Sequence, residues 1–311
     1  MPRLNPGSEL SVMNSDFEQY MTVTDCPYCH NTDAEKIADT PHTVRCKMCG
    51  LYRLFPRMTR DGQIAFVDYH YGALDIREWG NPLERAAQSK WEIGKLSEFF
   101  PSVFQDRADV LDVGCGEGGF VAALQQAGAF ADGLEPQQRL VLVGREHGLS
   151  LHKGRFEANE MPEELRGRTF DLICFRESIY YMPDLQEAFG LLRAYLKPGG
   201  RIYVKSHVGT SAYYKLNRDF AKRYSICVAA IPTRVALSRI LEREGYHVRG
   251  VIPYPNSGFD YLSLGPCAFS SLARRVMNTL SAQGELYLNK SMTYIANALG
   301  MGDCLCFFAC A

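Results

Sequence analysis

The 311-residue sequence lacks both a long apolar run and an excess of charge of either sign. Its longest apolar stretch, Cys304 to Ala311, is far shorter than the roughly 20 residues that a membrane-spanning helix needs. Met1 to Tyr20 also lacks an apolar run of the length found in signal peptides. We therefore expect a cytoplasmic protein with no membrane segment.

The charge balance and the composition narrow the class of protein. The 34 basic and 35 acidic residues nearly cancel, so net charge gives no general attraction to nucleic acid or to an anionic membrane. A small or neutral ligand is favoured, and nucleic acid is disfavoured as a partner. With 46% hydrophobic residues, the chain can bury one large core and leave sequence for a small appended module.

Four of the eleven cysteines form two closely spaced pairs. Cys26 and Cys29 make the first pair, and Cys46 and Cys49 make the second after sixteen intervening residues. Two Cys-x-x-Cys turns can supply the closed tetrahedral sulfur shell that structural zinc prefers. Without a secretion signal the thiols are expected to stay reduced, which favours a metal over a disulfide. The spacing predicts a structural Zn²⁺ site in a zinc ribbon; the alternative is four buried or redox-active cysteines.

The segment from Arg45 to Arg60 is locally basic and contains no acidic residue. Its cationic residues are Arg45, Lys47, Arg53, Arg57 and Arg60. Such a cluster can hold phosphate, either of a nucleotide sugar or of RNA, and it can equally be an ordinary solvated face.

A glycine-rich turn follows an apolar strand that begins at Ala108 and precedes a helix expected from Phe120 to Ala127. A strand, a glycine-rich turn and a helix N-terminus together allow the backbone to approach a charged ligand closely. The glycines Gly114, Gly116 and Gly119 also match dinucleotide-binding loops, so the surrounding motifs decide.

Further strands and helices alternate after this turn. We expect strands at Phe130 to Leu134, Ser150 to His152, Phe170 to Phe175 and Arg201 to Lys205, with a helix from Asp184 to Leu196 before the last of them. Repeated alternation of strand and helix predicts an α/β fold with a doubly wound, Rossmann-like sheet.

The ordered motifs resemble those of class I S-adenosylmethionine-dependent methyltransferases over about Ser89 to Tyr254. They are the glycine loop, Glu135 after the next strand, the strand from Phe170 and the Leu196-Lys197-Pro198-Gly199-Gly200 turn. The resemblance implies a seven-stranded sheet with an antiparallel last strand, and S-adenosyl-L-methionine as cofactor. The apolar run Cys304 to Cys310 fits that last strand, with Cys304, Cys306 and Cys310 expected in its core.

The same resemblance supplies candidate cofactor-binding residues. These are Asp112, Gly114, Cys115, Gly116, Glu135, Phe156, Glu157 and Arg176. It implies that the loop residues lie beside the methionine portion of the cofactor and that Phe156 and Glu157 lie near the adenine. Glu135 stands about twenty positions beyond the loop, where a carboxylate accepts hydrogen bonds from a ribose diol. The alternative is that Glu135 and Phe156 are ordinary strand-end and core residues.

The methyl acceptor should meet residues that follow the fourth and fifth strands, because ligands bind outside the carboxyl ends of parallel strands. The candidate catalytic residues there are His207, Tyr180, Tyr181 and Glu177. Methyl transfer needs alignment and, for a protonated acceptor, a base, for which His207 is the best candidate. Related proteins often carry histidine after the fourth strand, where this sequence has Glu177 and the two tyrosines. His207 could instead be a hydrogen-bonded strand-end residue, and the tyrosines could pack under a lid.

The motifs divide the chain into segments. We expect a flexible tail at 1–20, a zinc ribbon at 21–60, a helical lid or linker at 61–100 and the methyltransferase domain at 101–311. Residues 255–302 are expected to form a helical insertion before the last strand, with apolar periodicity in Leu272, Val276 and Leu280, used as a lid or a homodimer contact.

Three functions are compatible with these motifs. A Cys-x-x-Cys ribbon that ends in Cys49-Gly50-Leu51 and Pro56-Arg57 resembles the N-terminal part of methyltransferases that act on secondary metabolites, sugars and sugar nucleotides. This favours methyl transfer to a small-molecule acceptor. The alternatives are an RNA base methyltransferase that binds RNA through its ribbon, and a non-catalytic zinc-ribbon scaffold.

Overall fold

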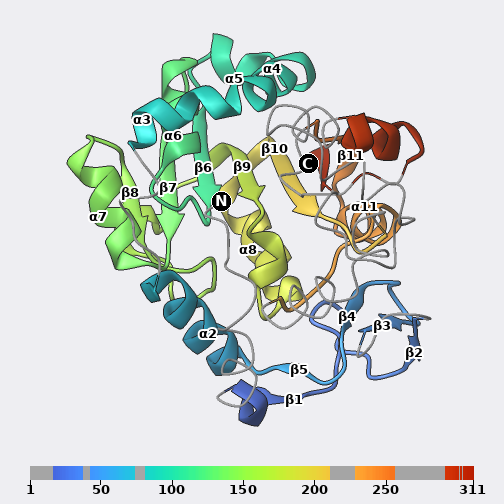
Figure 1. The fold of residues 1–311 in the computed structure, drawn as a ribbon. Helices are drawn as coiled ribbons and strands as arrows, with labels where there is room; N and C mark the ends of the chain where they lie inside the picture. The colour runs from blue at the N-terminus through green and yellow to red at the C-terminus, as the bar shows by residue number, and fades with distance from the viewer. Residues whose placement is uncertain are drawn as a thin grey trace, which may run out of the picture.

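A seven-stranded sheet forms the centre of the computed structural model, in the order β11-β12-β10-β9-β6-β7-β8 (Figure 1). The structure describes residues 17–37, 43–73, 81–210, 228–255, 291–300, 302 and 304–311. The strands are β6 (Asp109–Val113), β7 (Phe130–Glu135), β8 (Leu151–Lys153), β9 (Phe170–Arg176), β10 (Leu196–His207), β11 (His247–Pro253) and β12 (Cys304–Cys310). All neighbouring pairs are parallel except those of β12, which is antiparallel to both neighbours. This confirms the predicted doubly wound, Rossmann-like sheet with an antiparallel last strand.

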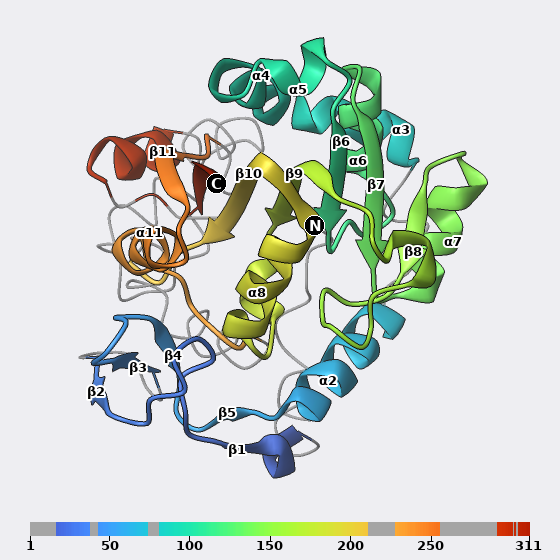
Figure 2. The ribbon, with the colours of Figure 1, turned by 180° about the vertical axis from the view of Figure 1, so that it is seen from behind.

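Alternating side chains of the strands build one hydrophobic core on each face of the sheet. In β9, Ile173 and Phe175 join the core beneath α8 and α11, whereas Leu172 and Cys174 join the core beneath α4 to α7. Figure 2 shows these helices around the sheet. Successive side chains of a strand point to opposite faces, so a strand buried on both faces is apolar throughout. The covering helices are α4 (Lys90–Phe99), α5 (Ser102–Gln105), α6 (Gly119–Gln126), α7 (Gln138–Glu146), α8 (Leu185–Tyr195) and α11 (Arg234–Arg243).

Side-chain caps fix where two of these helices begin. Asp184 accepts a hydrogen bond from the amide of Glu187 at the start of α8, and Thr233 accepts one from the amide of Ala236 at the start of α11. Each cap satisfies an amide that the first helical turn leaves without a partner. The short helices are η1 (Glu18–Tyr20), α3 (Pro82–Arg85), η3 (Ala86–Ser89), η4 (Glu163–Leu165) and η5 (Ile179–Tyr181).

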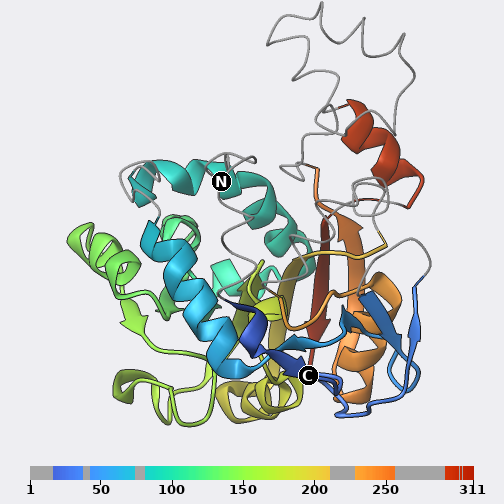
Figure 3. The same ribbon diagram turned by 60° about the horizontal axis from the view of Figure 1, so that its bottom comes forward.

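The N-terminal part forms two small sheets and one helix beside the carboxyl ends of the central strands (Figures 1 and 3). Strands β2 (Ala34–Lys36), β3 (Thr43–Cys46) and β4 (Tyr52–Leu54) make an antiparallel ribbon, while β1 (Met21–Val23) pairs with β5 (Arg57–Met58). Helix α2 (Arg60–Ala73) follows directly. The ribbon contacts the central domain through the Tyr28 hydroxyl, which donates a 2.6 Å hydrogen bond to Glu244.

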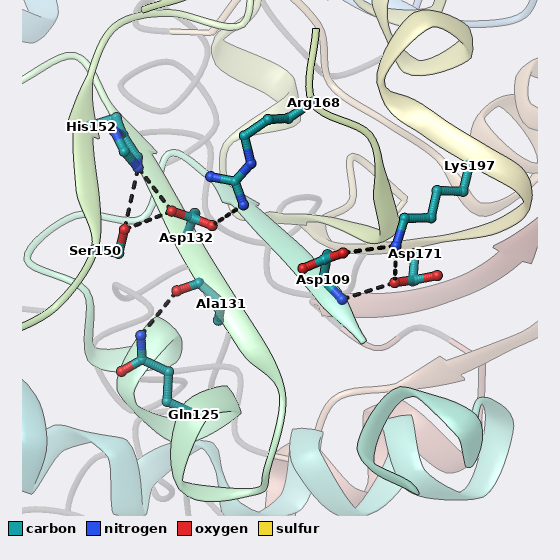
Figure 4. Close-up of polar contacts among 9 residues, drawn as sticks. All are labelled: Asp109, Gln125, Ala131, Asp132, Ser150, His152, Arg168, Asp171 and Lys197. Atoms are coloured by element: carbon teal, nitrogen blue, oxygen red, sulfur yellow. Dashed lines mark hydrogen bonds and ion pairs between the residues drawn. The ribbon is translucent and has the colours of Figure 1, made fainter. Parts of the chain in front are cut away.

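Polar side chains tie the strands together near one edge of the sheet (Figure 4). Asp132 on β7 accepts hydrogen bonds from Ser150 at 2.6 Å, His152 at 2.9 Å and Arg168 at 2.7 Å. Burial alone would raise the pKa of Asp132, but these three partners lower it well below its usual value. Ser150 and His152 belong to the neighbouring strand β8 and the turn before it, and Arg168 precedes β9, so the carboxylate links β7 to β8 and to the segment that leads into β9.

Several predicted segments fall partly outside the described residues. Of the expected insertion at 255–302, the structure describes 255, 291–300 and 302, with a helix at 291–298; Leu272, Val276 and Leu280 lie outside the described residues. Of the expected tail at 1–20, residues 1–16 also lie outside. Cys304 and Cys306 are buried in β12, as predicted, whereas Cys310 at the end of the strand is only partly buried. In the part of the chain that is described, no helix combines the length and apolar character needed to cross a membrane.

Candidate functional site

A cleft opens at the carboxyl ends of β6, β7 and β9 and is roofed by α2. Its floor consists of Val113, Gly114, Leu134 and Glu135; its walls consist of Gly154, Arg155, Phe156 and Glu157 on one side and Glu177, Ser178, Tyr181, Met182 and Pro183 on the other. Gln63, Ile64 and Val67 of α2 cover it. Ligands of open α/β sheets bind at this position, so the cleft is the candidate functional site.

The glycine loop between β6 and α6 lies against the loop that follows β9. Gly114 has a φ of +76°, and a Cβ atom there would lie 2.6 Å from the Cβ atom of Ser178. Gly116 and Gly118 also have positive φ values, of 60° and 91°. A residue with a side chain is strained in this conformation, so the loop requires glycine and keeps its backbone open to a ligand.

Glu135 ends β7 with its carboxylate turned toward the glycine loop. Its oxygens accept 2.9 Å hydrogen bonds from the amides of Gly116 and Gln137. Burial raises the pKa of Glu135 to about 7, and the two amides limit that rise. Carboxylate oxygens have several acceptor positions, so Glu135 can accept further hydrogen bonds from hydroxyl groups of a ligand in the cleft.

Asp112, one residue before the cleft floor, is a buried carboxyl group without a hydrogen-bond partner in the described structure. Its exposed fraction is 1%, and burial raises its pKa to about 7. An unpaired buried polar group is costly, so Asp112, which directly precedes the cleft-lining Val113, is a candidate contact for a bound ligand. A carboxylate in that position matches a positively charged group, and the methionine portion of S-adenosylmethionine carries both an ammonium and a sulfonium.

A buried ionic network lies behind this carboxyl group. Glu92 on α4 has an exposed fraction of 0% and accepts hydrogen bonds from Arg176 at 2.8 and 2.9 Å. The Tyr203 hydroxyl donates a further 2.9 Å bond to it, and the Lys205 ammonium lies 3.6 Å away. Burial would raise the pKa of Glu92, but Arg176 and Lys205 lower it more. Arg176 is thus held by Glu92 and does not line the cleft.

Glu177 joins the ends of β9 and β10. Its backbone has a φ of +58°, and its carboxylate lies 3.2 Å from Nζ of Lys205 and 3.4 Å from Nε2 of His207. Burial would raise the pKa of Glu177, but the charges of His207 and Lys205 lower it well below its usual value. A non-glycine residue at positive φ is uncommon and often occurs at a functional site. The 3.4 Å contact between Glu177 and His207 brings two of the predicted catalytic residues together.

The two tyrosines occupy different positions. Tyr181 lines the cleft, whereas Tyr180 is buried against Val228 and Ile231. The ring of Tyr180 lies 6.5 Å from that of His207, which is itself buried. Among the predicted catalytic residues, Glu177 and Tyr181 thus face the cleft, and Tyr180 and His207 lie behind it.

Helix α2 is held over the cleft by ion pairs with the loop after β8. Arg60 donates to Glu157 at 2.6 Å and to Glu160 at 3.3 Å.

Phe156 packs edge-on against Phe175, with ring centroids 5.5 Å apart, and leaves one side toward the cleft. Cys115 is buried under the loop, where burial raises the pKa of its thiol well above the usual value.

The predicted zinc ligands converge. The sulfur atoms of Cys26, Cys29, Cys46 and Cys49 all lie within 4.8 Å of one another. Zinc binds thiolate at about 2.3 Å, which separates sulfurs of a tetrahedral site by about 3.8 Å. The pairs Cys26–Cys49 and Cys29–Cys46 are each separated by 3.5 Å. The donor set and its spacing therefore fit a closed four-thiolate zinc site.

The basic segment does not form a common surface. Arg53 and Arg57 are buried, Arg45 pairs with Glu35, and Lys47 pairs with Asp33. The solvated-face interpretation fits Arg45, Lys47 and Arg60, which are partly exposed and paired with acidic residues, but not the buried Arg53 and Arg57.

Sequence reasoning missed Glu92 and Lys205. Glu92 lies one helical turn before buried Leu96, which is a weak signal because the same pattern occurs in ordinary amphipathic helices. Lys205 directly follows the apolar run Ile202-Tyr203-Val204 of β10, and a lysine in such a place indicates a buried ion pair.

The sequence matches one family of known proteins, the methyltransferase domain. The model described as a methyltransferase domain matches residues 83–250. A ubiquinone biosynthesis O-methyltransferase of Pseudomonas paraeruginosa is 31% identical over 101 residues, covering 31% of this chain and 43% of that protein. The Xylella fastidiosa protein of the same name is 34% identical over 112 residues, covering 35% and 46%. The matched region thus spans less than half the length of these curated relatives.

Solved structures give a weaker likeness. An S-adenosylmethionine-dependent methyltransferase from Mesorhizobium loti aligns with a TM-score of 0.46 and 16% identity, over 70% of this chain and 96% of that one. A second, from Archaeoglobus fulgidus, aligns with a TM-score of 0.46 and 18% identity, over 71% and 94%.

Proposed function

This chain belongs to the methyltransferase-domain family, and from that premise we propose that it transfers a methyl group from S-adenosylmethionine to a small-molecule acceptor. The observation that carries the proposal is the pairing of the glycine loop with Glu135 on the floor of one cleft. Asp112 adds a buried carboxyl group whose partner is absent from the described residues.

We propose that each end of the cofactor is held by a different part of the cleft. Glu135 would accept hydrogen bonds from the ribose diol, and Phe156 with Glu157 would flank the adenine. The glycine loop and Asp112 would hold the methionine portion. When bound, S-adenosylmethionine supplies a methyl group on a sulfonium, which is already a good leaving group, so the protein contributes mainly alignment.

We propose that the proton released by the acceptor is taken up at the end of β10, by His207. Glu177 faces the cleft and would accept a hydrogen bond from the acceptor hydroxyl or amine. The proton that the acceptor loses on methylation would pass through this carboxylate to Nε2 of His207, 3.4 Å away. Lys205 would keep Glu177 ionised, and Tyr181 would orient the acceptor from the same wall of the cleft.

The acceptor is proposed to be a secondary metabolite, a sugar or a sugar nucleotide. The relatives are named O-methyltransferases, which supports oxygen as the acceptor atom. Ile64, Val67 and Met182 give the cleft an apolar part suited to a carbon skeleton. The paired and buried arginines of the ribbon give no support to RNA as the acceptor.

We further propose that the four ribbon cysteines hold one structural zinc ion. The ribbon (21–60), the lid or linker (61–100) and the methyltransferase domain (101–311) are proposed as the units of the chain, with a homodimer contact through 255–302. A cytoplasmic location is proposed as well, because cysteines that bind zinc must stay reduced.

A transfer assay with S-adenosylmethionine labelled on its methyl group tests the function. The purified protein is incubated with hydroxylated aromatic compounds, sugar nucleotides and transfer RNA in separate reactions. We expect label in a small-molecule product and an equal amount of S-adenosylhomocysteine. Label in RNA would favour the alternative of an RNA base methyltransferase. Bound cofactor without transfer to any of the three classes of acceptor would favour a non-catalytic zinc-ribbon scaffold.

A further inference from the structure

Arg53 on β4 is a buried cation whose hydrogen-bonding capacity is largely unused. Its exposed fraction is 0%, and its Nη1 donates a 3.1 Å hydrogen bond to the carbonyl oxygen of Leu54. Its Nε and Nη2 atoms have no hydrogen-bond partner in the described structure. The Phe55 ring lies 5.3 Å from the guanidinium carbon, but a ring face does not use the in-plane N–H groups. A buried charge in this state is costly unless a further group pairs with it.

The register of the ribbon places Arg53 on the same face as one of the zinc ligands. Arg53 pairs with Val44 of β3, and Cys46 lies two residues beyond Val44. Side chains at i and i+2 of a strand share a face, as do directly opposite residues. Arg53 and Cys46 are both fully buried, which agrees with their lying on the same, inward face of the ribbon.

The negative charge of the zinc-bound thiolates would supply the partner that the Arg53 guanidinium lacks. Zinc with four thiolates carries a net charge of about −2, and the Cys26 and Cys46 residues are fully buried. Such a charge requires a counter-ion and N–H donors to its sulfurs when it is removed from water.

Arg57, the other buried arginine of the ribbon, is already engaged. Its guanidinium donates to the backbone oxygen and the carboxylate of Asp25, at 3.1 and 2.8 Å, and to the backbone oxygen of Pro183 at 3.4 Å. Arg45 is exposed and pairs with Glu35. Among the arginines of the described ribbon, Arg53 is therefore the buried cation with unused donors.

We propose that Arg53 is an outer-shell residue of the metal centre, which compensates the charge of the zinc-bound thiolates on the side of Cys26 and Cys46. This rests on the zinc site proposed above. Arg53 then contributes to metal affinity and has no part in cofactor binding.

The zinc dissociation constant of Arg53→Met, measured by competition with a chromogenic chelator, tests this role. We expect zinc to bind about 10- to 100-fold more weakly, the usual effect of losing an outer-shell partner. Arg45→Met is the matched control, because Arg45 adjoins the same ligand but lies on the exposed face; its zinc affinity should stay within about twofold. Arg53→Lys keeps the charge and should recover part of the loss.

Three results separate the possible failures. Unchanged affinity in a folded Arg53→Met protein would overturn the role of Arg53 and leave the zinc site standing. Equal losses in Arg53→Lys and Arg53→Met would also overturn it, because charge would not be what matters. A wild-type protein that holds no zinc would overturn the metal site itself. Cofactor affinity, measured by calorimetry on the same variants, should not change; a parallel loss would place Arg53 in the cleft instead.

Discussion

The backbone amide of Leu185 donates a 2.7 Å hydrogen bond to the carbonyl oxygen of Pro27, which stands between the first two ribbon cysteines. This bond ties one turn of the proposed metal site to the start of α8. Arg57 reaches the carbonyl oxygen of Pro183 from the same side, at 3.4 Å. Since Met182 and Pro183 line the cleft, the ribbon supports the wall on which the acceptor is proposed to bind.

Zinc removal should loosen that wall and spare the cleft floor. Without metal the Cys26–Cys29 turn loses its fixed shape, so the amide of Leu185 should exchange hydrogen faster, while the amide of Gly114, which bonds Leu134 at 2.8 Å, should not. Exchange measured by mass spectrometry before and after chelation, and again after zinc is restored, checks this. Equal protection of Leu185 in metal-free protein would contradict the coupling.

Loss of the buried Glu92 carboxylate should destabilise the fold. Glu92→Gln leaves Arg176 buried without its counter-ion, which costs about 3–5 kcal/mol of unfolding free energy. Glu98→Gln on the same helix removes only an exposed pair with Lys95 and should cost less than about 1 kcal/mol. Urea denaturation of the two variants measures both values. Similar stabilities would mean that the network is not a structural element of the site.

His207 and Glu177 should act together in turnover. His207→Ala should lower kcat by about 10²- to 10⁴-fold with cofactor affinity unchanged, because a general base contributes that much. Glu177→Gln should cause a similar loss. The lowered pKa of Glu177 keeps its carboxylate ionised near neutral pH, so the carboxylate is available to accept the proton of the acceptor. If Tyr181→Phe lost more activity than His207→Ala, the proton path through His207 would be contradicted and Tyr181 would be the more important residue.

Cofactor affinity should rise with pH because of Asp112. Its pKa of about 7 is raised above the usual value, so the carboxyl group is mostly protonated at pH 6 and ionised at pH 8. Only the ionised form attracts a cation, so affinity for S-adenosylmethionine should increase about tenfold over this range. Asp112→Asn should remove this tenfold increase, and any further increase with pH should belong to Glu135, whose pKa is also about 7. Calorimetry at several pH values measures this; an unchanged slope in Asp112→Asn would contradict it.

The parts of the site that follow from local sequence were predictable. The glycine loop needs positive φ at Gly114 and Gly116, and only glycine adopts it without strain, so the sequence carries the signal directly. Glu135 is recognisable because it ends the next strand. The four ribbon cysteines are recognisable by their spacing, since each pair lies in one turn.

The parts of the site that depend on contacts between distant residues were not predictable from the sequence. Glu92 meets Arg176 across 84 positions, and only the fold brings them together. Arg53 reads as an ordinary surface cation until the ribbon encloses it. His207 was predicted to face the acceptor, but the positive φ of Glu177 places that carboxylate in the cleft, with the imidazole behind it.

Isothermal titration of the purified protein with S-adenosylmethionine tests the central claim most directly. We expect one cofactor per chain and an affinity that falls about 10- to 150-fold in Glu135→Ala, the loss of roughly 1.5–3 kcal/mol of charge-assisted hydrogen bonding to the ribose. Glu146→Ala, an exposed carboxylate on α7, should bind as the wild type does. No binding of S-adenosylmethionine, or tighter binding of NAD in the same cleft, would contradict the account.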